Sequence, residues 1–240
     1  MRERIDSPLR ASAGSAAERA APPPERLELR ELSGWEEEYV ERHQAEPNTA
    51  RLCNEILARC LVAPGEDTAD ARRTVRDLLV AERDRELVAL RRLSLGPDVG
   101  ARVPCPACGE VSEADFSLDL LPLDFQQPPR RLSVELPDVG EVVLRLPTAG
   151  DQEDLLDAGL ENEAERRSWL LARCLERYGE RADGFDLDFA RGLPVRTRTA
   201  LEAAVEEALP ELDLAMAVEC SHCGAPIVAP FDVHVFFFSS

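Results

Sequence analysis

Two short cysteine turns constrain the fold of this chain more than any other feature. Each has the pattern Cys-x-x-Cys-Gly, at residues 105–109 and 220–224. Such a turn, or knuckle, places two thiolates on one side of a tight bend, and two knuckles supply the four soft ligands of a tetrahedral zinc ion. We therefore predict one structural zinc per chain, bound by Cys105, Cys108, Cys220 and Cys223.

The insert between the knuckles is 111 residues long, far longer than in an ordinary zinc ribbon. An internal duplication explains it, because the second knuckle repeats the first at a constant offset of 115 residues. Arg30 and Arg145 share that offset, and Leu-Ala-Arg-Cys-Leu at 57–61 recurs at 171–175 with an offset of 114. So long a period indicates two related half-domains rather than a solenoid.

The duplication divides the chain into three predicted regions. Residues 1–24 are rich in Ala, Arg, Ser and Pro, which predicts a disordered N-terminal arm. Residues 25–125 would form the first half-domain with the first knuckle, and 126–240 the second half-domain with the second knuckle. Each half has the size of a small domain, so the chain can bury a substantial core.

Local patterns in the first half predict one strand and then helices. Residues 27–32 alternate between apolar and polar types as a strand does, and Ser33 with Glu36 forms a capping box that opens a helix. Asn48 is placed to cap a second helix. Further elements are expected as helices around 75–80 and 83–93, followed by a short strand into the knuckle.

The second half opens with a hairpin signal, in which 132–136 and 142–146 alternate around Pro-Asp-Val-Gly. Later elements are expected as helices at 149–160, 163–177 and 195–209 and a strand at 213–219. The sequence thus predicts an α+β fold of two diverged repeat halves, joined by a zinc-ribbon-like pair of knuckles. Cys53, Cys60 and Cys174 fall on apolar helix faces and are predicted to be core residues.

The formal net charge is −19, which repels nucleic acid and anionic lipid. No apolar run approaches the roughly 18 residues of a membrane helix. Seven cysteines without a signal peptide indicate a reducing, cytoplasmic setting, in which thiols stay free or bind metal.

Alternatives to the shared zinc remain for the knuckle cysteines. They are unmetallated thiols, a redox pair, or separate knuckles that join two chains. A redox Cys-x-x-Cys normally opens a helix, where the dipole lowers a thiol pKa, whereas these lie between strand-like segments. His222 lies inside the second knuckle and would replace a thiolate only if one cysteine were not a ligand.

Several segments resemble a known family. They are Arg-Glu-Leu-Ser-Gly at 30–34, Arg-Asp-Arg-Glu-Leu at 83–87, Leu-Arg-Arg-Leu-Ser-Leu-Gly at 90–96, the first knuckle, and Pro-Phe-Asp at 230–232. Together they resemble the baseplate hub assembly chaperones of T-even-type phages, which also occur in bacterial contractile injection gene clusters. The resemblance implies baseplate or hub proteins as partners. This chain departs from the pattern at Pro97-Asp98, where the family has a more aromatic, acidic run, and at Ser221-His222.

No catalytic motif is present, neither a nucleophile elbow, a phosphate-binding glycine loop nor a His–carboxylate pattern, so we expect no enzyme. The acidic clusters fall at predicted helix starts, where they favour the helix dipole and form solvated faces. The aromatic tail at 231–238 is either part of the core or an exposed docking patch.

The sequence therefore predicts a non-enzymatic assembly chaperone for the baseplate or hub of a phage tail or contractile injection system, acting through protein–protein binding. One alternative is a structural baseplate component that stays in the particle. Another is a zinc-ribbon nucleic-acid-binding or regulatory protein, which fits the knuckles but lacks the basic face that such proteins need.

Overall fold

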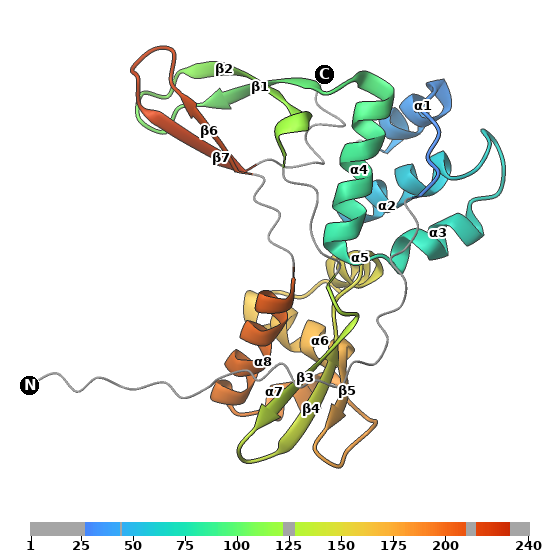
Figure 1. Ribbon diagram of the computed structural model, residues 1–240, viewed down its shortest axis with the longest axis vertical. Helices are drawn as coiled ribbons and strands as arrows, with labels where there is room; N and C mark the ends of the chain where they lie inside the picture. The colour runs from blue at the N-terminus through green and yellow to red at the C-terminus, as the bar shows by residue number, and fades with distance from the viewer. Residues whose placement is uncertain (1–26, 44, 122–127, 210–214, 231–240) are drawn as a thin grey trace, which may run out of the picture. The chain divides into compact units, whose positions relative to one another are not determined.

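The computed structural model describes residues 27–43, 45–121, 128–209 and 215–230 (Figure 1). They fold into two compact units. Among the described residues, the knuckle unit comprises 27–43, 45–121, 148–159 and 215–230, and the central unit comprises 128–147 and 160–209. Helices and strands occur in both units, which confirms the predicted α+β class.

The helices of the knuckle unit come from both halves of the chain. The first half supplies α1 (Gly34–Arg42), α2 (Thr49–Cys60), α3 (Ala69–Arg76) and α4 (Val80–Leu95), and the second half supplies α5 (Ala149–Asp157). Helix α5 packs against α2, α3 and α4. The core of this unit includes the almost fully buried Ile56, Leu57, Val75, Leu87 and Leu90.

The predicted helix caps are confirmed. Ser33 and Glu36 form the capping box of α1, in which the Ser33 backbone N–H donates to the Glu36 carboxylate at 3.0 Å. The Asn48 side chain accepts from the Arg51 N–H at 3.0 Å and caps α2. In both contacts a side-chain oxygen accepts from a backbone N–H at a helix start, where no carbonyl of a preceding turn is available.

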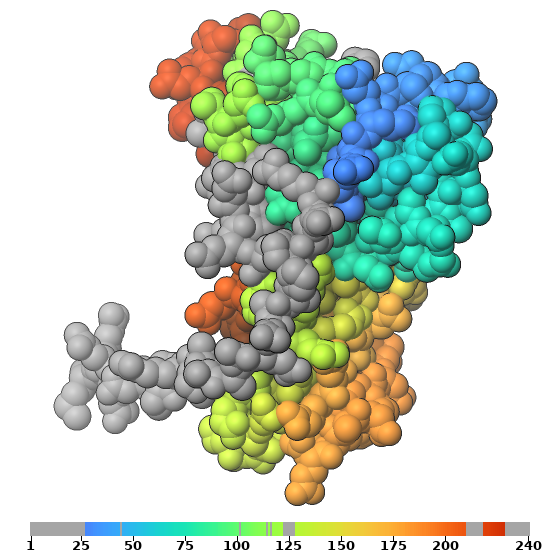
Figure 2. Space-filling model, turned by 45° about the vertical axis from the view of Figure 1, so that its right-hand side comes forward, coloured from blue at the N-terminus to red at the C-terminus, as the bar shows by residue number. Residues whose placement is uncertain are grey.

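Two hairpins complete the described part of the knuckle unit. Strand β1 (Asp98–Pro104) pairs with β2 (Val111–Ser117), and β6 (Ala215–Glu219) pairs with β7 (Pro226–Pro230), both antiparallel. A short 3₁₀ helix, η1 (Leu118–Leu120), follows β2. The second hairpin, red in Figures 1 and 2, lies against the green first hairpin.

Within its described residues, the central unit holds an antiparallel sheet with the order β3-β4-β5. Its strands are β3 (Arg131–Leu136), β4 (Gly140–Arg145) and β5 (Leu175–Tyr178), and its helices are α6 (Glu163–Cys174), α7 (Leu187–Gly192) and α8 (Val195–Ala208). The predicted hairpin is β3-β4, and Gly140 has a φ of 86° at its turn. Cys174 lies in the core of this unit with Leu144, Leu171 and Leu201.

Two pairs of helices begin at the 115-residue spacing of the predicted repeat. Helices α1 and α5 begin at Gly34 and Ala149, and α4 and α8 begin at Val80 and Val195, in both cases 115 residues apart. The α2 and α6 helices have 12 residues each and are capped by Asn48 and Asn162. The compact units nevertheless do not follow the predicted division into 25–125 and 126–240, because α5 and the β6-β7 hairpin group with elements of the first half.

The structure differs from the local predictions in three places. Residues 27–32 form no strand, although the Arg30 N–H donates to the Cys60 carbonyl at 2.9 Å. The helix expected around 75–80 instead spans Ala69–Arg76. The helix expected at 163–177 stops at Cys174, because the following residues pair with β4 as strand β5.

Two predicted segments lie outside the described residues: the arm at 1–24 and the aromatic tail at 231–238. Among the helices that the structure does describe, none combines the length and the apolar character needed to cross a bilayer.

Candidate metal centre

The two knuckles have the same backbone geometry. In the first, the Cys105 N–H donates to the Glu110 carbonyl at 2.8 Å, and the Gly109 N–H donates back to the Cys105 carbonyl at 2.9 Å. In the second, the bond from Cys220 to Ala225 and the bond from Gly224 to Cys220 are each 2.9 Å long. Each pair of bonds closes the tip of its hairpin and fixes the direction of the cysteine side chains.

Glycine is required where each knuckle turns back into a strand. Gly109 has a φ of 77° and Gly224 a φ of 72°, both in the left-handed region that a side chain disfavours. A Cβ added at either position would meet nothing within 4 Å, so the requirement is conformational rather than steric.

The fold brings the four predicted cysteines into one cluster. Their Sγ atoms all lie within 4.8 Å of one another. The Cys105–Cys223 and Cys108–Cys220 pairs, each across the two hairpins, have Sγ–Sγ distances of 3.7 Å. A tetrahedral zinc with Zn–S bonds of about 2.3 Å requires sulfur atoms about 3.8 Å apart, so this cluster fits such an ion.

One cysteine of each knuckle is buried and the other is exposed. Cys105 and Cys220 are 2% and 4% exposed and pack with Ile227, whereas Cys108 and Cys223 face solvent. The cluster therefore has an apolar floor and an open side through which an ion can enter.

A backbone N–H group donates to the sulfur of each buried cysteine. Ala107 donates to Cys105 Sγ and His222 donates to Cys220 Sγ, both at 3.4 Å. His222 thus contributes its backbone N–H, and its ring does not belong to the four-cysteine cluster.

The thiols of the cluster differ in acidity. A hydrogen bond from the Ser112 hydroxyl, helped by backbone hydrogen bonds within the knuckle, lowers the pKa of Cys220 to about 5. At Cys108 a backbone hydrogen bond involving Glu110 acts in the same direction, but desolvation and hydrogen bonds with the other thiols outweigh it and raise the pKa to about 12. A cation at the centre would favour loss of all four protons.

Comparison with known proteins places the chain in a family. A family model described as T4 bacteriophage base plate protein matches residues 24–238. The chain belongs to this baseplate family. The match supports the baseplate part of the sequence-based resemblance, and it does not single out the narrower group of hub assembly chaperones. Neither a curated protein nor a solved structure matches the chain.

Sequence reasoning missed Ser112 in this baseplate-family protein. Ser112 lies on β2, is fully buried, and places its hydroxyl 3.4 Å from Cys220 Sγ of the other hairpin. The predicted repeat offered a signal for it, because the position 115 residues later is Ile227, an apolar residue. A polar side chain at a position that is apolar in the other copy calls for a buried hydrogen-bond partner.

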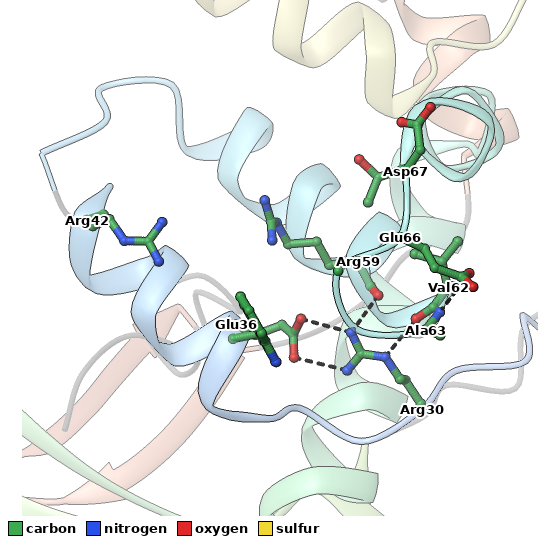
Figure 3. A pocket seen from close by; sticks show the side chains of 11 residues that line it. Arg30, Glu36, Arg42, Arg59, Val62, Ala63, Glu66 and Asp67 are labelled. Carbon is green, nitrogen blue, oxygen red and sulfur yellow. Dashed lines mark hydrogen bonds and ion pairs between the residues drawn. The ribbon is translucent and has the colours of Figure 1, made fainter.

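The baseplate-family protein also has a surface pocket between α1, the end of α2 and the loop that follows it (Figure 3). Arg30 lies at this pocket, and its guanidinium donates to both Glu36 carboxylate oxygens, at 2.8 and 3.0 Å. It also donates to the backbone carbonyls of Val62 at 2.7 Å and Arg59 at 2.8 Å. Arg30 therefore fixes the helices here rather than offering a free cation to a ligand.

The remaining predicted core cysteines are confirmed. Cys53 and Cys60 lie in the core of the knuckle unit, and Cys174 lies in the core of the central unit. Burial raises the pKa of Cys60 to about 12, so this thiol stays protonated and unreactive at neutral pH.

Proposed function

We propose that this baseplate-family protein is a non-enzymatic assembly factor for the baseplate or hub of a phage tail or contractile injection system. It binds a baseplate or hub component, holds that component's interface during assembly and is then released. The family match is the observation that carries the baseplate context of this proposal. We place this step in the cytoplasm of the cell that builds the particle.

The metal in this proposal is one structural zinc per chain, held by Cys105, Cys108, Cys220 and Cys223. Four clustered thiols support this role because four thiolates fill a tetrahedral shell. A filled shell leaves no position for a substrate or an activated water, so the ion supplies rigidity rather than chemistry. It joins the hairpin of the first half to that of the second.

We further infer that the chain arose by duplication. The element starts at a spacing of 115 residues and the matching hydrogen bonds of the two knuckles support this inference. The shared ion then connects equivalent points of the two copies.

The charge of the chain supports a transient rather than a permanent partnership. A net charge of −19 speeds encounter with a basic partner surface and makes the complex sensitive to salt. The same charge disfavours nucleic acid as a partner.

Particle composition tests this function. Complete particles and the unassembled baseplate intermediates are purified from producing cells that carry a tagged copy of the protein, and each fraction is quantified by mass spectrometry. We expect the protein in the intermediates but not in complete particles. A fixed number of copies in every complete particle would instead identify a structural baseplate component, which the family description also accommodates.

A deletion strain completes the test, with a complementing plasmid as the control. Loss of baseplates while sheath and tube proteins are still made would support the assembly role. Normal particles in the deletion strain, or tight, salt-sensitive DNA binding by the purified protein, would overturn it.

A further inference from the structure

Ser112 belongs to the first hairpin, but its side chain contacts a predicted metal ligand of the second hairpin. It lies on β2, opposite Val103 of β1, and its side chain is fully buried. Its hydroxyl donates to Cys220 Sγ at 3.4 Å, although the two residues are 108 positions apart in the sequence. The contact therefore joins the first hairpin to a predicted ligand on the second.

The Ser112 hydroxyl also contacts Ser221 through two groups. The Ser221 backbone N–H donates to Ser112 Oγ at 3.2 Å. A hydroxyl has one proton to donate and lone pairs to accept with. The Ser221 hydroxyl lies 3.4 Å from Ser112 Oγ, and either oxygen can be the donor in that pair. When both Ser221 groups donate to the lone pairs of Ser112 Oγ, the Ser112 proton points at Cys220 Sγ.

The arrangement is not repeated by the second copy. Ile227 takes the position equivalent to Ser112 and is 2% exposed, so it contributes packing and no hydrogen bond. The two buried cysteines therefore differ in their hydrogen bonds. Cys220 accepts one from a hydroxyl of the opposite hairpin, whereas Ile227, at the equivalent position, has no donor for Cys105.

We propose that Ser112 is a positioning residue of the metal centre, which holds the Cys220 sulfur in the geometry that the ion requires. This inference rests on the metal site proposed above. A hydrogen bond to a metal-bound thiolate orients the sulfur and withdraws electron density from it. Residues in this position typically change metal affinity by 10- to 100-fold.

Cobalt(II) is a suitable probe, because thiolate-to-cobalt charge-transfer bands report both the number of thiolates and their electron density. In the full-length protein, Ser112→Ala should weaken cobalt and zinc binding by about 10- to 100-fold. It should also move the charge-transfer bands to lower energy, because the sulfur loses its hydrogen bond.

Two control variants separate this effect from packing. Ser221→Ala removes the hydroxyl 3.4 Å from Ser112 Oγ but keeps the Ser112 hydroxyl and the Ser221 backbone N–H. Ile227→Val removes one methylene group from the same small cluster. Neither should shift the bands. Affinity and bands of Ser112→Ala equal to those of the natural protein would overturn the role of Ser112 while leaving the metal site in place.

A second result would also overturn the role of Ser112. If Ser112→Ala weakened binding only as much as Ile227→Val does and did not shift the bands, packing would account for the loss of affinity. Failure of the metal site itself would look different. The natural protein would bind no cobalt, or its spectrum would show fewer than four thiolates.

Discussion

The Asn54 side-chain amide donates a 2.9 Å hydrogen bond to the carboxylate of Glu153, a residue 99 positions further along the chain. The same amide donates to the Ala149 carbonyl at 3.2 Å. Arg76 pairs with Glu153 and with Asp154, each at 2.7 Å. Helix α5 is thus held in the knuckle unit by a polar network that is buried at Asn54 and partly buried at Arg76 and Asp154, while the segments on both sides of α5 fold in the central unit.

Asn54→Ala should lower the free energy of unfolding by about 1–3 kcal/mol, because Asn54 is 1% exposed and two buried acceptors would each lose one hydrogen bond. Urea denaturation followed by circular dichroism measures the change. Arg42→Ala is the matched control, since its ion pair with Glu38 is exposed at both ends and should contribute less than about 1 kcal/mol. Equal losses in the two variants would contradict a role of Asn54 in holding α5.

Gly150→Ala should destabilise the protein, although alanine normally favours a helix over glycine by about 1 kcal/mol. A Cβ at Gly150 would lie 3.1 Å from the Arg76 carbonyl oxygen and 3.2 Å from its Cβ, so α5 would have to move away from α3. We expect a loss of about 1–3 kcal/mol. Gly34→Ala, where a Cβ meets nothing within 4 Å, should be neutral or stabilising, and the same thermal-melt series would show both.

Glu36 should make stability depend on pH in the acid range. Burial alone would raise its pKa, but hydrogen bonds from Arg30 and Ser33 outweigh burial and lower the pKa from 4.5 to about 2. A lowered carboxyl pKa gives stability that is complete above about pH 5 and is lost as the pH falls toward 2. Glu36→Gln should therefore be less stable than the natural protein by about 2 kcal/mol at pH 6, and the gap should close near pH 2. A gap that does not change with pH would argue against this ion pair.

Thiol counting should distinguish the metal ligands from the core cysteines. The chain has seven cysteines, of which Cys53, Cys60 and Cys174 are buried in helical cores. We expect the zinc-loaded protein to react slowly with a thiol reagent, a strong chelator to expose four thiols, and denaturant to expose all seven. Four fast thiols before any chelator is added would show that the knuckles hold no ion.

Metal stoichiometry should separate one shared site from two. We expect one zinc per chain by elemental analysis, with Cys105→Ser and Cys220→Ser each releasing it, because each would remove one ligand of the same ion. Both variants should also destabilise the hairpins of the two halves together. Two zinc ions per chain, or unchanged stability in Cys220→Ser, would exclude the shared site.

Features encoded within a few residues could be predicted from the sequence. Ser33 with Glu36, Asn48 before α2, and the alternation on either side of the turn at Gly140 each specify a local hydrogen bond or a local turn. The knuckles belong to the same class, because Cys-x-x-Cys-Gly fixes its own turn. The family match confirms the baseplate part of the resemblance that such motifs indicated, and it leaves the narrower chaperone group a prediction.

Features that depend on distant partners required the tertiary structure. Leu175–Tyr178 continues a helical pattern in sequence, and it becomes strand β5 because the edge of β4 is available to it. Helix α5 is predicted by its own residues, yet only Asn54 and Arg76 show that it joins the knuckle unit.

The sequence by itself determined which residues turn, cap and carry thiols, since those properties arise from neighbours along the chain. The tertiary structure decided which of them meet. It brought the Sγ atoms of four cysteines within 4.8 Å and placed the Ser112 hydroxyl beside Cys220. Contacts between residues about 100 positions apart arise from packing, and packing depends on the whole chain at once.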